Sequence, residues 1–344
     1  MGKTMTGALK ESLELLASGD SFAPNEMRHA MNVLLSGEAS DAEIAGFLMA
    51  LRMRGATVEE LTAGVEAMRE VAIPVTAPDD AIDTCGTGGD GANTFNISTA
   101  VALIAAGAGA KVAKHGSTAS SSRSGSAEVL RELGVNLEAS PEQIGKCIKD
   151  AGVGFMFAAV HHKAVKNVMA ARRQLGVRTI FNVLGPLSNP ARAKRQLMGV
   201  YERDLLRPAA EVMRRLGVEA AWVVHGGDGL DELTTTGPSY VAELRDGVVR
   251  EFMVSPDIAG LPRATLEDLR GGEPAENAQA IKRLLDGEKG PFRDIALLNA
   301  GAALVITGKA GDIADGVQKA AEAVDNGAAK TAMENLVKLS NAPE

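Results

Sequence analysis

The pattern of apolar and polar residues divides the chain into a helical N-terminal part and a longer part in which strands and helices alternate. In the first part, apolar residues recur at helical spacing, which predicts helices over residues 5–17, 24–35, 41–54 and 57–71. Asp41 and Thr57 are the expected N-caps. Because short helices alone make a small core, we expect this part to pack with another segment.

From Ala81 onward, short apolar runs alternate with helical patterns, and this alternation predicts a parallel sheet covered by helices. The expected strands are residues 81–84, 111–114, 153–157, 197–200, 221–225 and 240–244. Residues 72–80, with prolines and acids, are expected to form a hinge strand. Residues 292–339 are expected to be helical, with small residues that allow close helix packing. The expected fold class is α/β: a small all-helical N-terminal domain plus a larger α/β domain with a mostly parallel central sheet.

A glycine-rich stretch lies between the first expected strand and a helical pattern. Its sequence over 83–91 is Asp-Thr-Cys-Gly-Thr-Gly-Gly-Asp-Gly, and Asn96, Ser98 and Thr99 follow. Glycines let backbone N–H groups approach an anion, and the helix behind them adds the positive end of its dipole. The three polar residues are N-cap types that can also contact phosphate or a metal. This pattern favours a phosphate-binding turn over an ordinary glycine-rich loop.

The surrounding sequence narrows the choice of phosphate ligand. No Gly-Lys-Ser/Thr follows at P-loop spacing, which argues against a nucleoside triphosphatase. Gly86, Gly88 and Gly91 fit the dinucleotide fingerprint, but the helix is expected to begin later, near Asn96. The next strand ends in basic Lys114-His115-Gly116 where that fingerprint needs an acid, so the nicotinamide interpretation fails.

A second polar loop follows at residues 114–126, with a lysine, a histidine and several serines before another helical run. In a parallel sheet, loops at the carboxyl ends of neighbouring strands lie side by side. Two such loops suit a ligand with separated phosphate groups. A serine-rich linker is the alternative, but linkers are not held between two apolar helices.

These motifs together resemble the anthranilate phosphoribosyltransferases of tryptophan biosynthesis, and the resemblance covers nearly the whole chain. The matching motifs are Cys-Gly-Thr-Gly-Gly-Asp-Gly at 85–91, Asn-Ile-Ser-Thr at 96–99, Lys-His-Gly at 114–116 and Ser-Gly-Ser-Ala at 124–127. The resemblance implies that Lys114 and His115 are catalytic. It also implies that the phosphoribosyl diphosphate donor contacts Gly86, Gly89, Asp90, Thr94, Asn96, Ile97, Ser98, Thr99, Lys114, His115, Gly116, Ser117, Thr118, Ala119, Ser120, Ser121, Ser122 and Ser126.

The segment 178–187, Arg-Thr-Ile-Phe-Asn-Val-Leu-Gly-Pro-Leu, is a further match to the family. The resemblance implies that it returns to the helical domain. The expected domains are therefore 1–74, joined by the returning segment at about 164–190, and a donor-binding α/β domain over 75–344. His161 and His162 could suggest a metal, but adjacent helical positions face different ways, so we disfavour metal ligation by this pair.

The resemblance implies that anthranilate contacts Gly86, Ser117, His162 and Arg172. A guanidinium can hold a planar carboxylate by two hydrogen bonds, which suits Arg172 to this role. The alternative is that Arg172 and Arg173 lie on a solvated helix face.

Two adjacent acids, Asp231 and Glu232, follow another expected strand through a glycine-rich loop. Paired carboxylates at the edge of the sheet that carries the phosphate loops point to Mg²⁺, a hard ion held by oxygen. The resemblance also implies Mg²⁺, with Asp231 and Glu232 on one ion and Ser98 near another.

The chain departs from the family on the acceptor side. Family members have Asn-Arg where this chain has Ser117 and Thr118. They have His-His-Pro where this chain has His161-His162-Lys163. A serine hydroxyl offers one donor where an amide offers two. The donor assignment is therefore firmer than the choice of acceptor.

Composition excludes several classes of protein. The 344 residues carry a formal net charge of −8 without a dense basic stretch, so nucleic acid is a poor partner. Cys85 and Cys147 show neither metal-ligand spacing nor a disulfide framework, as expected in a reducing cytoplasm. With no signal peptide or membrane-spanning run, we expect a cytoplasmic protein without a membrane partner. Apolar N-terminal helices with a small core suggest a homodimer through the helical domain.

We therefore expect transfer of phosphoribose from 5-phosphoribosyl-1-diphosphate to anthranilate, giving N-(5-phosphoribosyl)anthranilate and diphosphate with Mg²⁺ as cofactor. Whether His115 is a base or a positioning group stays open. Three alternatives remain: a related transferase with another acceptor, a pyrimidine nucleoside phosphorylase-like enzyme, and a non-catalytic relative that binds nucleic acid. The phosphorylase needs no Mg²⁺, so the acid pair argues against it.

Overall fold

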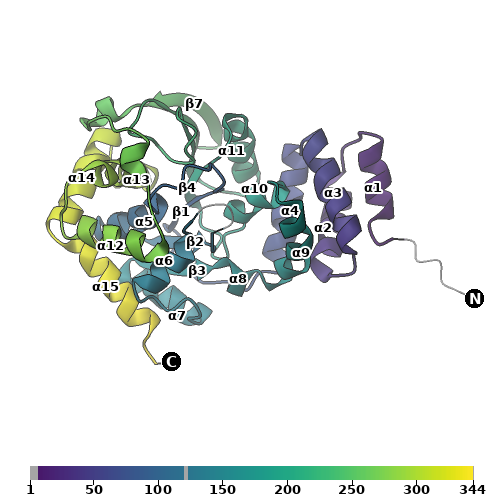
Figure 1. The fold of residues 1–344 in the computed structure, drawn as a ribbon, viewed down its shortest axis with the longest axis horizontal. Coiled ribbons are helices and arrows are strands. Elements are labelled where there is room, and N and C mark those ends of the chain that lie inside the picture. The colour runs from purple at the N-terminus through teal and green to yellow at the C-terminus, as the bar shows by residue number, and fades with distance from the viewer. Residues whose placement is uncertain (1–6, 120–122, 344) are drawn as a thin grey trace, which may run out of the picture. The chain divides into compact units, whose positions relative to one another are not determined.

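The computed structural model describes residues 7–119 and 123–343, and the chain divides into two compact units. One unit comprises the chain up to Ile73 together with Ala159–Ser188. The other comprises Pro74–Ala158 and the chain from Asn189 onward. The first unit is helical, and the second contains the sheet (Figure 1).

The helical unit contains the expected N-terminal helices and two more from the returning segment. Their bounds are α1 Lys10–Ala17, α2 Pro24–Ser36, α3 Asp41–Arg54, α4 Val58–Glu70, α9 Lys166–Leu175 and α10 Ile180–Leu187. Helix α9 packs against α2 and α3, and α10 packs against α4. The apolar faces of the first four helices are thereby covered in part by the returning segment, as their small core requires.

One predicted N-cap of this unit is confirmed and one is wrong. The Thr57 hydroxyl accepts a hydrogen bond from the Glu60 N–H at the start of α4, as expected. The cap of α3 is Ser40 rather than Asp41, because the Ser40 hydroxyl accepts from the Glu43 N–H and the Glu43 carboxylate accepts from the Ser40 N–H. This reciprocal pair satisfies two N–H groups that a helix start leaves without partners.

The second unit is built on a seven-stranded sheet of order β3-β2-β1-β4-β5-β6-β7. Its strands are β1 Ile82–Gly86, β2 Val112–Gly116, β3 Val153–Phe157, β4 Arg195–Gly199, β5 Ala220–Gly226, β6 Ser239–Arg245 and β7 Val248–Val254. Strands β1 to β5 are parallel, and β6 and β7 are antiparallel additions at one edge. The expected mostly parallel sheet is therefore confirmed.

Two expectations about the strands fail. Residues 72–80 form no strand, because their prolines remove the N–H groups that a ladder would need. Strand β7 was not expected, since most of its residues are exposed and its edge position buries only Val254. Such an edge strand lacks the apolar run that marks the buried parallel strands.

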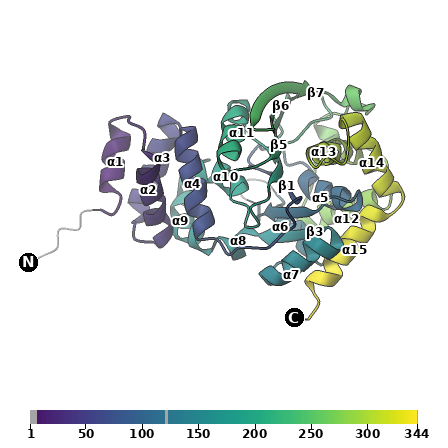
Figure 2. The ribbon, with the colours of Figure 1, turned by 180° about the vertical axis from the view of Figure 1, so that it is seen from behind.

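The helices of this unit pack against the sheet and against one another. Their bounds are α5 Ile97–Gly107, α6 Ser126–Glu132, α7 Pro141–Lys146, α11 Leu206–Arg215, α12 Pro274–Leu285, α13 Pro291–Ile306, α14 Ile313–Asp325 and α15 Ala328–Ser340. The short helix α8 Ala158–His161 contains the point in the chain where the sheet unit ends and the helical unit resumes. Helix α5 packs against α13, α14 and α15 (Figure 2). No helix of the described chain has the length and apolar character needed to cross a bilayer.

The small residues of α13 allow the close packing that the sequence predicts. A Cβ atom at Gly316 of α14 would lie 2.5 Å from the Gly301 carbonyl oxygen of α13. Real Cβ atoms do not approach backbone this closely, so glycine at this crossing is required for the observed helix spacing. Helix α13 is thereby held firmly behind the sheet.

Candidate active site

The glycine-rich loop follows β1 at the point where the chain order of the sheet reverses. From β1 the chain passes to β2 on one side, and it later returns to β4 on the other. In open parallel sheets, ligands bind outside the carboxyl ends of the strands at such a switch point. Residue pairs Gly86–Gly199 and Gly116–Phe157 show that these strands end at one edge.

The loop after β5 carries Asp231 and Glu232 and is called the acidic loop. Glycines allow it to approach this edge of the sheet. The Gly88 N–H donates to Asp231 Oδ2 at 2.7 Å. A Cβ atom at Gly86 would lie 2.4 Å from Asp231 Oδ2, and one at Gly199 would lie 1.5 Å from the Asp231 carbonyl oxygen. Neither strand could carry a side chain at its end, so these glycines are needed for Asp231 to reach the first loop.

Lys114, Ser98 and Glu232 come together at the same edge, from β2, α5 and the acidic loop. Lys114 Nζ donates to the Thr84 carbonyl oxygen at 2.5 Å and to Ser98 Oγ at 3.3 Å. The Ser98 N–H donates to the Glu232 carboxylate. The structure thus brings together the predicted cation, the start of the predicted phosphate-binding helix and one of the predicted metal ligands.

Asp83 supports this cluster, although its role was not predicted. It is fully buried in β1 and accepts hydrogen bonds from the His115 N–H at 3.0 Å and Asn189 Nδ2 at 2.7 Å. Burial lowers the pKa of Lys114, and the charges of Asp83 and Glu232 oppose that shift. A lone acid inside an otherwise buried strand is the sequence signal that could have identified it.

The acidic side chains at this edge destabilise one another's charged forms. Burial, followed by the nearby Asp90 carboxylate, raises the pKa of Asp231 to about 7. Burial and Asp231 also raise the pKa of Glu232 well above its ordinary value. Within the described residues, no group of three or more His, Cys, Asp or Glu side chains forms a complete metal-ligand set. A cation here would need further oxygen ligands.

Some of the predicted contact residues in the first loop and at the start of α5 are held by backbone bonds of the loop, and others are buried. Gly89 and Gly91 have positive φ, as glycine permits, and the Asp90 carboxylate accepts from the Ala92 N–H. Thr94 pairs through its backbone with Arg270, and Ile97 and Thr99 are buried at the start of α5.

Asn96 occupies the N-cap position of α5, but its side chain does not cap the helix. Its Oδ1 accepts from Ser124 Oγ at 3.0 Å and from Asn277 Nδ2 at 2.8 Å, and its Nδ2 donates to the Ser124 carbonyl oxygen. The side chain therefore joins the two predicted phosphate loops to α12. The helix therefore begins where the sequence predicts, but the Asn96 amide bonds other segments instead of the first turn of α5.

The second loop is tightly folded around Gly125. A Cβ atom there would lie 2.3 Å from the Ala119 nitrogen. The Glu128 carboxylate accepts from the Gly125 and Ala119 N–H groups, and Ser126 Oγ donates to the Ser117 carbonyl oxygen. Ser117 and Thr118 are exposed beyond Gly116 at the end of β2. The predicted contacts Ser120, Ser121 and Ser122 lie outside the described residues.

The other two predicted acceptor residues belong to the helical unit. His162 is buried, and burial together with His161 lowers its pKa to about 4, so its ring is neutral at pH 7. Arg172 is half-buried in α9 and lies over the Phe181 ring at 5.1 Å. Among the residues that the structure describes, no carboxylate acts on Arg172, whose pKa is lowered by burial alone, whereas Arg173 beside it is exposed. Arg172 therefore offers a guanidinium to an outside anion.

Comparison with known proteins gives matches over both units. The model of the glycosyl transferase family, a/b domain, matches residues 78–330, and the model of its helical bundle domain matches residues 10–72. An anthranilate phosphoribosyltransferase of Parvibaculum lavamentivorans is 56% identical over 332 residues, which cover 96% of this chain and 97% of that protein.

Solved structures give the same picture. The anthranilate phosphoribosyltransferase of Thermus thermophilus matches with a TM-score of 0.91 and 43% identity, over 96% of this chain and 99% of that one. The Saccharomyces cerevisiae enzyme in complex with PRPP and Mg matches with a TM-score of 0.89 and 28% identity, over 96% and 97%.

Because the pKa of Asp231 is raised, replacing this acid by a neutral residue should stabilise the folded protein, and more so at high pH than at low pH. The folded protein holds this proton up to about pH 7, whereas an unfolded Asp loses it near its ordinary pKa of 3.8. Stability therefore falls as pH rises between these values, by an amount on the order of a few kcal/mol. We expect Asp231→Asn, without ligand, to unfold at higher urea concentration than wild type at about pH 8, with a smaller gain at about pH 4.

Asp257→Asn is the control for this measurement. Its hydrogen bond with Arg263 lowers the pKa of Asp257, the opposite direction, so this variant should gain no stability at high pH. An equal response of Asp231→Asn at both pH values would contradict the assignment.

Proposed function

This chain belongs to the glycosyl transferase family, and we propose that it transfers the phosphoribosyl group of 5-phosphoribosyl-1-diphosphate to anthranilate in tryptophan biosynthesis. The products are N-(5-phosphoribosyl)anthranilate and diphosphate. The observation that supports this most directly is the cluster of Lys114, Ser98 and the Asp231–Glu232 pair beside the glycine-rich loop. The named relatives, similar over nearly the whole chain, support the same reaction.

The donor's phosphates have suitable partners at the sheet edge. The loop between β1 and α5 presents backbone N–H groups without Cβ atoms in the way, and the α5 N-terminus adds a favourable dipole. Lys114 supplies a fixed positive charge. We assign the diphosphate to this loop with Lys114, and the second loop around Ser117 and Ser126 to the other phosphate end of the donor.

In the reaction, the bond between ribose C1 and the diphosphate oxygen breaks, and its electron pair leaves with diphosphate. The amine nitrogen of anthranilate forms the new bond to C1 and then loses a proton. Lys114 stabilises charge that grows on the departing diphosphate, which is the kind of electrostatic contribution that lowers such barriers most. The charge of Asp83 opposes the effect of burial on the pKa of Lys114, and its hydrogen bond from the His115 N–H fixes the strand beside that lysine.

The chemistry of the acidic side chains fits Mg²⁺. Asp231 and Glu232 are held close in a partly desolvated place where their negative charges are unfavourable, and a divalent cation would relieve that cost. Because the described residues supply few ligands, donor phosphate oxygens and water would complete the coordination, as is usual for Mg²⁺. When bound, Mg²⁺ would neutralise charge on the diphosphate, and the structure of the yeast relative is a complex with PRPP and Mg.

We assign anthranilate to Arg172, neutral His162, Ser117 and Gly86. Arg172, without a carboxylate partner in the described chain and fixed over Phe181, is suited to hold the anthranilate carboxylate. Another structure of the yeast relative is a complex with 4-fluoroanthranilate, which supports this acceptor class. His115 follows Lys114 at the carboxyl end of β2. We assign it to the reacting amine of anthranilate, as a base or as a positioning group.

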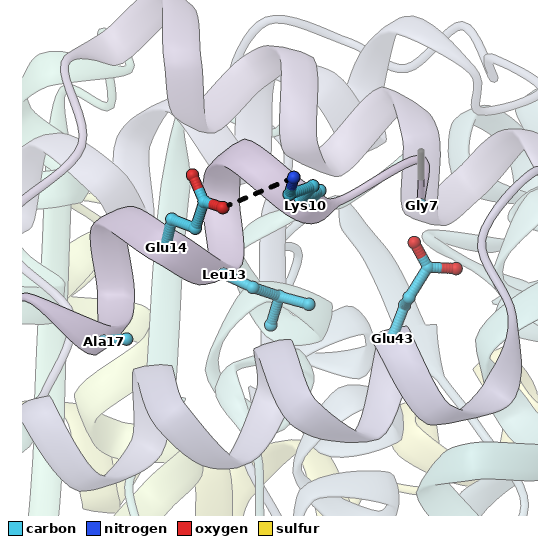
Figure 3. A pocket seen from close by; sticks show the side chains of 6 residues that line it. All are labelled: Gly7, Lys10, Leu13, Glu14, Ala17 and Glu43. Carbon is cyan, nitrogen blue, oxygen red and sulfur yellow. Dashed lines mark ion pairs between the residues drawn. The ribbon is translucent and has the colours of Figure 1, made fainter. Parts of the chain in front are cut away.

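We further propose that the protein is a cytoplasmic homodimer joined through the helical unit. Met53 of α3 is 84% exposed, an unusual exposure for a large apolar side chain. Helices α1 and α3 also border an open hollow lined by Gly7, Lys10, Leu13, Glu14, Ala17 and Glu43 (Figure 3). A second copy that covers these parts of α1 and α3 would bury both features.

The first test is loss of anthranilate fluorescence with the diphosphate donor and Mg²⁺. Wild type should turn over, and Asp231→Asn with Glu232→Gln should lose at least about 10²-fold in rate, since tight electrostatic contacts to the reacting groups carry contributions of that size. Asp257→Asn with Glu267→Gln, which removes exposed acids of the same unit, is the control. Phosphate-driven cleavage of uridine or thymidine, with no use of anthranilate, would indicate the phosphorylase alternative.

Arg172→Ala should raise the KM for anthranilate about ten- to a hundredfold and leave the donor KM nearly unchanged. A hydrogen bond to a charged group contributes about 1.5–3 kcal/mol, which corresponds to that range. Arg173→Ala, an exposed neighbour on the same helix, should change neither value. An equal rise in both KM values for Arg172→Ala would instead indicate general damage to the helical unit.

The oligomeric state tests the helical face. Wild type should sediment as a dimer, and Met53→Glu should shift it toward monomer because a charge would enter the interface. Val248→Glu alters a residue that is 50% exposed on the sheet unit, and it should leave the dimer intact. Wild type that sediments as a monomer at all concentrations would end this proposal.

A further inference from the structure

One polar side chain interrupts the apolar surface of α13. Asn299 is fully buried, and its neighbours Leu298 and Ala300 belong to the main hydrophobic core. Burying an amide in such surroundings is costly unless every polar atom has a partner. The partners of Asn299 therefore indicate why an amide occupies this position.

The Asn299 amide bonds both peptide groups of a single residue in the acidic loop. Its Oδ1 accepts from the Leu233 N–H at 2.9 Å, and its Nδ2 donates to the Leu233 carbonyl oxygen at 2.8 Å. Nδ2 also donates to the Ile295 carbonyl oxygen at 2.9 Å, one turn earlier in α13. The orientation of the amide is thus fixed from both ends, and within the described chain no other group bonds the Leu233 peptide.

Leu233 directly follows the acid pair. On the other side of that pair, the Gly88 N–H holds the Asp231 carboxylate, and the Ser98 N–H holds the Glu232 carboxylate. Leu233 itself is fully buried among apolar side chains. The two carboxylates are therefore placed between contacts to the glycine-rich loop and a backbone anchor on α13.

We propose that Asn299 is a positioning residue of the active site, which sets the direction of Asp231 and Glu232 by fixing the backbone of Leu233. This inference rests on the proposed function of the acid pair. It assigns a role in the reaction to a side chain that touches no substrate. A helix behind the sheet, held by the close crossing at Gly301 and Gly316, makes a rigid base for such an anchor.

The test replaces the amide with an apolar side chain of similar volume, Asn299→Leu. We expect kcat/KM for the diphosphate donor to fall about ten- to a hundredfold, as is typical when the support of a site's charged groups is lost, with little change in the anthranilate KM. Hydrogen exchange of residues 228–236 should become faster. Gln143→Leu is the matched control, because this amide also bonds backbone carbonyls, those of Leu339 and Ala342, away from the site.

A second variant, Asn299→Asp, separates positioning from packing. A protonated carboxyl offers one acceptor and one O–H donor, as the amide does toward Leu233, whereas a carboxylate would face two carbonyl oxygens. Burial favours the protonated form, so the activity of this variant relative to wild type should rise as pH falls from about 8 to about 6. This variant also provides the measurement if Asn299→Leu does not fold.

Wild-type kinetics for Asn299→Leu, with stability lowered as in Gln143→Leu, would overturn the positioning role. Unchanged hydrogen exchange at residues 228–236 would overturn the anchor itself, whatever reaction the protein catalyses. If wild type transfers no phosphoribose, the proposed function fails, and the exchange measurement still decides whether Asn299 fixes this loop.

Discussion

The approach of the acidic loop to the glycine ends of β1 and β4 is the constraint on which the rest of the site depends. Asp231 bonds the Gly88 N–H at 2.7 Å, and its carbonyl oxygen occupies the space that a Cβ at Gly199 would need. A side chain at Gly86 or Gly199 would move the acids away from Lys114 and Ser98. The lack of side chains at Gly86 and Gly199 thus determines where the charges of the acidic loop lie.

Those charges are balanced across the sheet. Lys114 is buried, and burial lowers its pKa, whereas the charges of Asp83 and Glu232 oppose that shift. The acids in turn are unfavourable in their charged forms, because burial and then the nearby Asp90 carboxylate raise the pKa of Asp231. Without ligand, this arrangement costs stability, which is common where charges are prepared for a reaction. A bound diphosphate and a divalent cation would each pair with the opposite charge already in place.

Local pattern was sufficient for the parallel strands and for the glycine-rich loop, because buried strands are short apolar runs and glycine marks turns directly. It failed where the partner is distant in sequence. Asn96 stands at the expected start of α5, but its amide bonds Asn277, which is 181 residues away, instead of capping the helix. Strand β7 was not predicted because most of its residues are exposed and show no apolar pattern. The capping residue of α3 was wrong by one position, since Ser40 and Asp41 are both suitable types.

The C-terminal helices explain why a sequence far from the phosphate loops is still part of the site. Asn277 of α12 holds the Asn96–Ser124 junction, and Asn299 of α13 holds the backbone after the acid pair. Each is a buried amide, and hydrogen bonds such as these offset the cost of burying it. Loops at a sheet edge have few contacts of their own, so their precision must come from rigid elements behind them. In this fold, the small residues that let α13 and α14 pack closely are what make that support rigid.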